Sequence, residues 1–124
     1  MEKKHTRRVF VCSPYRGKTP EETQENIQAA RKAVRFIAQR GDAPYAPHLY
    51  LPQTLRETII GMLLGQADDD PVEREMGIKA GLAFLEKCDE LVVFAYKGIT
   101  EGMQRELAHA NICNIPVTVI WTRL

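Results

Sequence analysis

The chain has 124 residues, of which 44% are apolar and 27% charged, and its formal net charge at pH 7 is +1. This length and balance predict one soluble globular domain over residues 1–124 with a single core. A nearly neutral chain implies no strong electrostatic partner. Nucleic acid is therefore not expected to bind, although residues 3–8 form a short basic cluster.

The first part of the chain predicts a buried strand followed by a capped helix. Val9–Cys12 is a continuous apolar run, typical of a strand buried on both faces, and Ser13–Lys18 follows as a loop. Thr19 precedes Pro and two Glu residues, a strong helix start, and Gly41 marks the end of that helix. Ala43–Ala46 is a weak strand whose proline suits the edge of a sheet.

The rest of the chain predicts three more helices and two more strands. An irregular connection over Pro47–Pro52 is followed by a capping box at Thr54, which begins a helix through about Leu63, and then by a polar break from Gly65 to Asp69. The remaining elements are a helix from Asp70 to about Cys88, a buried strand over Leu91–Tyr96, a helix over Thr100–Cys113 with Asn114 as its left-handed cap, and a strand over Val117–Trp121.

Alternation of strands and helices predicts an α/β fold with a doubly wound parallel sheet and right-handed connections. We expect about four strands in the order 2-1-3-4. Because the last strand is apolar and terminal, we also expect a homodimer or larger homo-oligomer that covers it.

Cysteine usage and hydropathy favour a cytoplasmic protein. Cys12, Cys88 and Cys113 lie far apart, each in or beside an apolar run, as expected for reduced thiols. No pair has zinc-ligand spacing, and the acidic run at residues 68–70 lacks the alternation of a calcium loop. No metal, cofactor or membrane is therefore expected, since there is also no signal peptide and no apolar run long enough to span a bilayer.

Ligands of doubly wound folds bind beyond the carboxyl ends of the strands, and this rule selects three loops. They are residues 13–18, 47–50 and 97–102. In the first of these loops, a Ser hydroxyl, an Arg guanidinium and a glycine that allows close approach of the backbone suit the binding of a phosphate or sugar. The alternative interpretation is a polar turn without a ligand. A lone histidine is more often structural, and an aromatic ring more often packing. The candidate binding residues are Ser13, Tyr15, Arg16, Gly17, His48, Thr100 and Gly102.

Glu106 is the candidate catalytic residue. Thr100 is suited to cap the last helix, and Gly102 lies four residues before Glu106 on the same face. Helical side chains lean toward the N-terminus, so the carboxylate should reach over the glycine into a small open site beside free N–H groups. Such a site could hold a sugar or phosphate and attack it. The alternative is an exposed Glu106 paired with Arg105 or Lys97.

Two motifs together resemble the nucleoside 2-deoxyribosyltransferase superfamily, which includes the deoxynucleoside 5′-monophosphate N-glycosidases. They are Ser13-x-x-Arg16-Gly17, and Thr100-x-Gly102-x-x-x-Glu106 after a strand that begins Cys88-Asp89-Glu90-Leu91. A small bacterial and phage branch of the superfamily is most similar. The resemblance implies a flavodoxin-like, Rossmannoid fold and cleavage or transfer of the N-glycosidic bond of a nucleoside or nucleoside 5′-monophosphate. Glu106 would be the nucleophile that forms a covalent glycosyl-enzyme.

The resemblance also leaves a second function open. These enzymes usually provide another carboxylate just before the third major strand, at a position near residues 77–81, where this chain has none. The alternative is a non-catalytic nucleotide-binding module of the same fold, in which Glu106 only hydrogen-bonds a sugar hydroxyl. Neither motif selects the base, the sugar, or water against a second base as the acceptor.

Overall fold

The computed structural model describes residues 5–49 and 71–124, with the side chains of residues 71–74 left out of the description. Four parallel strands form its sheet in the order β2-β1-β3-β4. The predicted strand order is therefore confirmed. The predicted helix from Thr54 to Leu63, the polar break from Gly65 to Asp69 and the Asp70 cap lie outside the described residues. The strands are β1 (Arg8–Cys12), β2 (Ala43–Tyr45), β3 (Glu90–Phe94) and β4 (Val117–Ile120).

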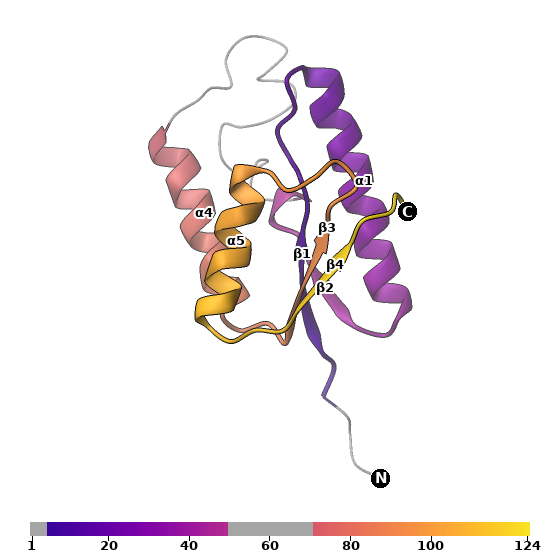
Figure 1. Ribbon diagram of the computed structural model, residues 1–124, viewed down its shortest axis with the longest axis vertical. Helices are drawn as coiled ribbons and strands as arrows, with labels where there is room; N and C mark the ends of the chain where they lie inside the picture. The colour runs from indigo at the N-terminus through magenta and orange to yellow at the C-terminus, as the bar shows by residue number, and fades with distance from the viewer. Residues whose placement is uncertain (1–4, 50–70) are drawn as a thin grey trace.

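Helices cover both faces of the sheet (Figure 1). Helix α1 (Pro20–Gln39) lies on one face, and α4 (Pro71–Leu85) and α5 (Glu101–Ile112) lie on the other. The short 3-10 segment η1 (Pro47–Leu49) follows β2. The carboxyl ends of the strands and the first turns of α1 and α5 point the same way, upward in Figure 1. Within the described chain, no helix combines the length and apolarity that crossing a membrane requires.

Strand β1 lies between β2 and β3, and its side chains belong to two hydrophobic clusters. Phe10 and Cys12 belong to the cluster beneath α4 and α5, whereas Val9 and Val11 belong to the cluster beneath α1. All four residues are fully buried. A strand with period-two geometry can be apolar at every position only if both sheet faces are covered, as the continuous run predicted. The proline-containing β2 lies at the edge, as predicted.

The observed helix boundaries lie within a few residues of the predicted ones. Thr19 caps α1 by accepting from the Glu22 N–H at 3.1 Å, and Asn114 takes the left-handed conformation with φ 58°. Helix α4 ends at Leu85, three residues before the predicted Cys88. After Leu85, the N–H groups of Lys87 and Cys88 donate to carbonyl oxygens three residues back, so a tighter turn ends the helix. Strand β3 then begins at Glu90, one residue before the predicted Leu91, in register with Val9.

Glu90 explains why a polar residue opens a buried strand. Its carboxylate accepts from Thr118 Oγ1 at 2.6 Å, Arg7 Nη2 at 3.0 Å and Arg40 Nη2 at 3.3 Å. Burial would raise the pKa of Glu90, but the hydrogen bonds from Thr118 and Arg7 outweigh it and the pKa is lowered. One carboxylate thus ties the start of β3 to β4, to the residue before β1 and to the end of α1.

We expect Glu90→Gln to destabilise the fold by about 1–3 kcal/mol at pH 7, because it removes the charge that two arginines share. The lowered pKa means that this contribution is present above the unfolded pKa of about 4.5 and is lost as the pH falls through the folded value. Urea unfolding of both proteins at pH 7 and pH 3 measures it.

Glu25→Gln is the matched control. The Glu25 side chain is 71% exposed and has only a 3.8 Å ion pair with Lys97 among the described residues, so its change should stay within about 0.5 kcal/mol. If Glu90→Gln costs no more than this control, the carboxylate is not the tie between these elements.

Candidate functional site

The carboxyl end of β1 divides the site into two sides. Cys12 packs with Met103 of α5 in the core beneath that helix. Ser13 is the next residue, and it lines a cavity with Ala29 of α1 and Phe94 of β3. Two consecutive side chains therefore face opposite sides of the sheet, as the pleat requires.

Glu106 lies on the α5 side, with its Oε1 atom buried. Among the side chains that the structure describes, none hydrogen-bonds to this oxygen. Burial raises the pKa of Glu106 to about 7, although the Cys12 thiol beside it works in the opposite direction. At neutral pH this carboxyl group therefore exists in both protonation states, which suits a nucleophile or a proton carrier.

Cys12 is the immediate neighbour of that carboxyl group. Burial, and then the charge of Glu106, raise the pKa of the Cys12 thiol far above its usual range. The thiol stays protonated, and its single proton is donated to the Met103 carbonyl oxygen at an Sγ–O distance of 3.8 Å. Cys12 is therefore unsuited to act as a nucleophile itself.

The first turn of α5 has the predicted form. Thr100 Oγ1 accepts from the Met103 N–H at 3.3 Å, and the Thr100 N–H in turn lies 3.5 Å from Met103 Sδ. Gly102 is exposed, and a Cβ added to it would meet no described atom within 4 Å. Among the described atoms, the position over Gly102, one helical turn before Glu106, is therefore open.

His48 of η1 contacts the loop after β1 and supports it. Its Nε2–H donates to the Ser13 carbonyl oxygen at 2.8 Å, and its ring stacks on Tyr15 with centroids 5.2 Å apart. Burial lowers the pKa of His48 to about 4, although the bond to Ser13 opposes this shift. The imidazole is thus neutral at physiological pH, and the described contacts give it a structural task.

Gly17 and Arg16 complete the same loop. The Gly17 N–H donates to Thr23 Oγ1 at 2.8 Å, and a Cβ at Gly17 would lie 2.5 Å from the Glu22 Cβ. This close approach gives the glycine a packing reason that requires no ligand. Arg16 is half-buried, and its Nε atom is enclosed.

Asn26 joins the first loop to the loop after β3, although no motif in the sequence marks it as a site residue. Its Nδ2 donates to the Tyr15 carbonyl oxygen at 2.9 Å. Its Oδ1 accepts from Tyr96 Oη at 3.3 Å and from Lys97 Nζ at 3.2 Å. One feature of the sequence could have pointed to Asn26: the buried face of α1 contains the polar Thr23 and Asn26 beside apolar residues. A buried amide inside a helix needs partners, and here these are two loops.

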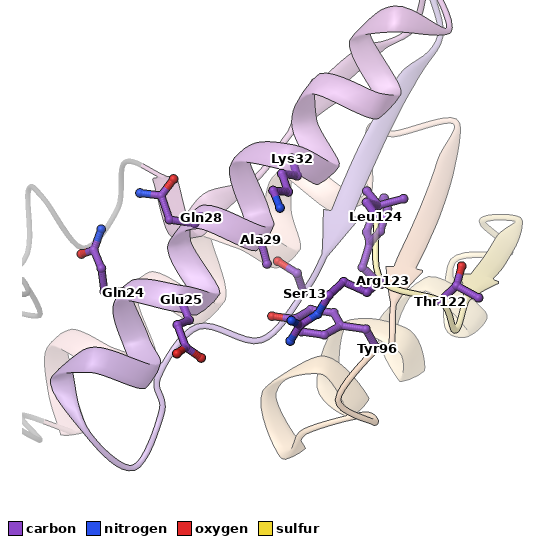
Figure 2. Close-up of a pocket in the computed structure, with 11 residues that line it drawn as sticks. Ser13, Gln24, Glu25, Gln28, Ala29, Lys32, Tyr96, Thr122, Arg123 and Leu124 are labelled. Carbon is purple, nitrogen blue, oxygen red and sulfur yellow. The ribbon is translucent and has the colours of Figure 1, made fainter.

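A cavity of about 390 Å³ opens on the α1 side at this end of the sheet (Figure 2). Its volume falls within the range of small-molecule sites. Ser13 Oγ is buried there without a described hydrogen-bond partner, beside the Tyr96 ring, over which the Arg123 guanidinium lies at 5.2 Å. Lys32 of α1 adds a second cation to the lining. Among the described residues, Glu106 is not part of that lining.

The structure therefore brings the candidates together in two groups. The first surrounds the loop after β1 and contains Ser13, Tyr15, Arg16, Gly17 and His48. The second opens α5 and contains Thr100, Gly102 and Glu106. Cys12, next to Ser13 in the chain and against Glu106 in space, lies between them. Their roles in binding and catalysis remain predictions.

Comparison with solved structures shows the class of fold. The chain is similar to a 2-deoxyribosyltransferase from the psychrotolerant bacterium Bacillus psychrosaccharolyticus, with a TM-score of 0.52 and 17% sequence identity over 90% of this chain and 70% of that one. At this identity the likeness establishes the fold. The predicted α/β architecture, of the deoxyribosyltransferase type, is confirmed.

The family follows from a second comparison. Residues 7–120 match the model of a family described as a domain of unknown function, DUF7768, and the chain belongs to that family. A search of curated proteins gave no match.

The low pKa of His48 predicts how the first loop responds to acid. Between pH 6.5 and about 4 the unfolded chain takes up a proton at this histidine and the folded chain does not, so stability falls as the pH is lowered. The loss reaches at most about 3.5 kcal/mol, because the pKa is lowered by about 2.5 units and one unit corresponds to about 1.4 kcal/mol. His48→Gln keeps an N–H donor for Ser13 and should remove this part of the pH dependence.

Chemical unfolding of both proteins from pH 7.5 to pH 4 gives the difference. Subtracting the variant is necessary because Glu106 acts in the opposite direction: its raised pKa favours the folded state at low pH, and this advantage disappears as the pH rises from 4.5 to about 7. Parallel curves for the two proteins would show that His48 is not held neutral.

Proposed function

We propose that this protein cleaves or transfers the N-glycosidic bond of a nucleoside or nucleoside 5′-monophosphate. The observation that carries the proposal is the Glu106 carboxyl group, with a pKa of about 7, a buried oxygen without a described partner and an open space over Gly102. The fold shared with a 2-deoxyribosyltransferase supports the same reaction class.

The chemistry follows from placing the anomeric carbon of the sugar in that space. Glu106 attacks the carbon, the C–N bond breaks, and the electron pair of that bond departs with the base, which takes a proton from water. The product is an ester between Glu106 and the sugar. Water then attacks the same carbon to give hydrolysis, or a second base attacks to give transfer, and either reaction frees the carboxylate again.

A 5′-phosphate is the substrate group that the remaining residues suit best. The first turn of α5 carries N–H groups at the positive end of the helix, beside the site in front of Glu106. Arg16 supplies a planar fork that matches phosphate oxygens. Together they favour a nucleoside 5′-monophosphate over the neutral nucleoside.

The raised pKa predicts the pH profile of the reaction. Glu106 must be ionised to attack, so kcat/KM for release of free base should rise about tenfold per pH unit below pH 7 and level off above it. A phosphate monoester itself titrates near pH 6, so a neutral deoxynucleoside should be assayed in parallel. A profile that is flat from pH 5 to pH 8 with both substrates would exclude Glu106 as the attacking group.

Substitutions at the same position test the nucleophile directly. Glu106→Ala should reduce base release from a panel of deoxynucleotides by at least about 10³-fold, because the covalent route is lost. Glu106→Gln should still bind product-like ligands, since its shape is kept. Glu101→Gln, an exposed change at the first residue of the same helix, is the control and should retain activity. Equal turnover by wild type and Glu106→Ala would contradict the assignment.

A second candidate is a non-catalytic module that binds nucleotides with the same loops. The favouring observation is Glu75, the described carboxylate nearest in sequence to residues 77–81. Arg105 holds it in two hydrogen bonds of 3.1 and 3.3 Å and lowers its pKa, so Glu75 stays ionised and is unsuited to protonate a departing base. Loss of acid assistance typically slows such a reaction about 10²–10⁴-fold.

Arg16→Ala separates the two candidates. In a module it should abolish phosphate-dependent affinity in calorimetry with nucleoside monophosphates, and neither protein should release base. In the enzyme it should mainly lower kcat/KM toward phosphorylated substrates while a neutral nucleoside is turned over as before. Wild type that neither binds nor releases base would remove both functions.

A further inference from the structure

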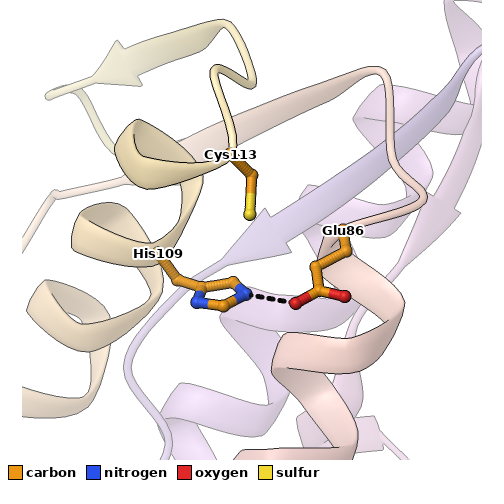
Figure 3. Close-up of side chains that lie close together, drawn as sticks. All are labelled: Glu86, His109 and Cys113. Atoms are coloured by element: carbon orange, nitrogen blue, oxygen red, sulfur yellow. Dashed lines mark hydrogen bonds and ion pairs between the residues drawn. The ribbon is translucent and has the colours of Figure 1, made fainter.

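Three potential metal ligands meet at the end of the molecule opposite the candidate site. Glu86 follows the last residue of α4, His109 lies in the last turn of α5, and Cys113 caps that helix (Figure 3). One carboxylate oxygen, one ring nitrogen and the sulfur all lie within 4.8 Å of one another. The His109 Nε2 atom is 2.9 Å from Glu86 Oε1.

The backbone holds these three positions without help from a ligand. The Cys113 N–H donates to the His109 carbonyl oxygen at 3.0 Å, which fixes the two residues on one helical turn. The Glu86 N–H donates to the Leu82 carbonyl oxygen at 3.2 Å, so the α4 hydrogen-bond pattern continues through it. The preceding Leu85 is completely buried. The site therefore joins two helix ends that the core already fixes.

We propose that Glu86, His109 and Cys113 bind a zinc ion. Thiolate and imidazole together select zinc over magnesium, calcium or manganese, which prefer oxygen ligands. A thiolate and a carboxylate would neutralise the two charges of the ion. The ion would replace the hydrogen bond between His109 and Glu86 and would be held by ligand atoms that already lie within 4.8 Å of one another. Zinc binds such ligands at 2.0–2.3 Å.

The site has an open side and room for exchange with solvent. The side chains of His109 and Glu86 are 23% and 49% exposed. Three protein ligands leave the fourth tetrahedral position to water. The zinc site is independent of the proposed glycosidic reaction, because Glu106 is not among its ligands.

Cobalt(II) tests the proposal because a bound thiolate gives a charge-transfer band in the near ultraviolet. The full chain, reduced and freed of metal, should bind one equivalent of cobalt with that band, and zinc should displace it. Cys113→Ser should lose the band, and His109→Ala should weaken zinc binding about 100-fold in competition with a chromogenic chelator. Circular dichroism confirms that each variant is folded.

Cys88→Ser is the matched control, because Cys88 is also half-buried but lies outside the cluster. This variant should keep the band and the affinity. The proposal is overturned if wild type shows no thiolate band, if Cys88→Ser loses it as Cys113→Ser does, or if His109→Ala binds zinc as tightly as wild type. Each of these results would leave only the hydrogen bond between His109 and Glu86.

Discussion

The constraint on which the site depends is the burial of β1 on both faces. Each residue of this strand must serve one of two cores, so consecutive side chains at its carboxyl end are committed to opposite sides. Cys12 goes to α5 and meets the Glu106 carboxyl group. Ser13 goes to α1 and opens into the cavity. A shift of one residue in the register of β1 would exchange the two sides and expose the thiol to the cavity.

Two glutamates of this fold show how the surroundings of a buried carboxyl group decide its use. Glu90 is buried among Thr118, Arg7 and Arg40, and its pKa is lowered. Glu106 is partly exposed, but its Oε1 atom is buried, it lies beside a thiol that stays protonated, and its pKa is raised to about 7. The first carboxylate is saturated with donors and ties elements together. The second keeps an oxygen without a described donor.

Much of the fold could be predicted because its signals are local. Continuous apolar runs marked β1 and β3, and the caps at Thr19 and Thr100 are where spacing placed them. The opening over Gly102 also followed from helical spacing. Residues whose role depends on contacts far along the chain could not be found in this way. Asn26 joins loops up to 71 residues away, and the stack of Tyr15 on His48 depends on how β2 places η1.

The same reason explains why no metal was expected from the cysteines. Zinc motifs are recognised by pairs close in sequence, whereas Glu86 and Cys113 meet only because α4 and α5 end side by side. His109 and Cys113 are four residues apart on one helix, and this spacing is the part of the cluster that the sequence alone could indicate. The partner from α4 required the tertiary structure.

The raised pKa of Glu106 also helps to decide between an enzyme and a binding module. Keeping the carboxyl group ionised above pH 7 costs the fold about 3 kcal/mol, since the shift from 4.5 to about 7 is some 2.5 pKa units. A module that only hydrogen-bonds a sugar hydroxyl would be served as well by an exposed carboxylate or an amide, at no such cost. A nucleophile gains from it, because a poorly solvated carboxylate has less hydration to lose when it attacks. A destabilising arrangement that improves attack and is not needed for binding is typical of an active site, and it favours the enzyme.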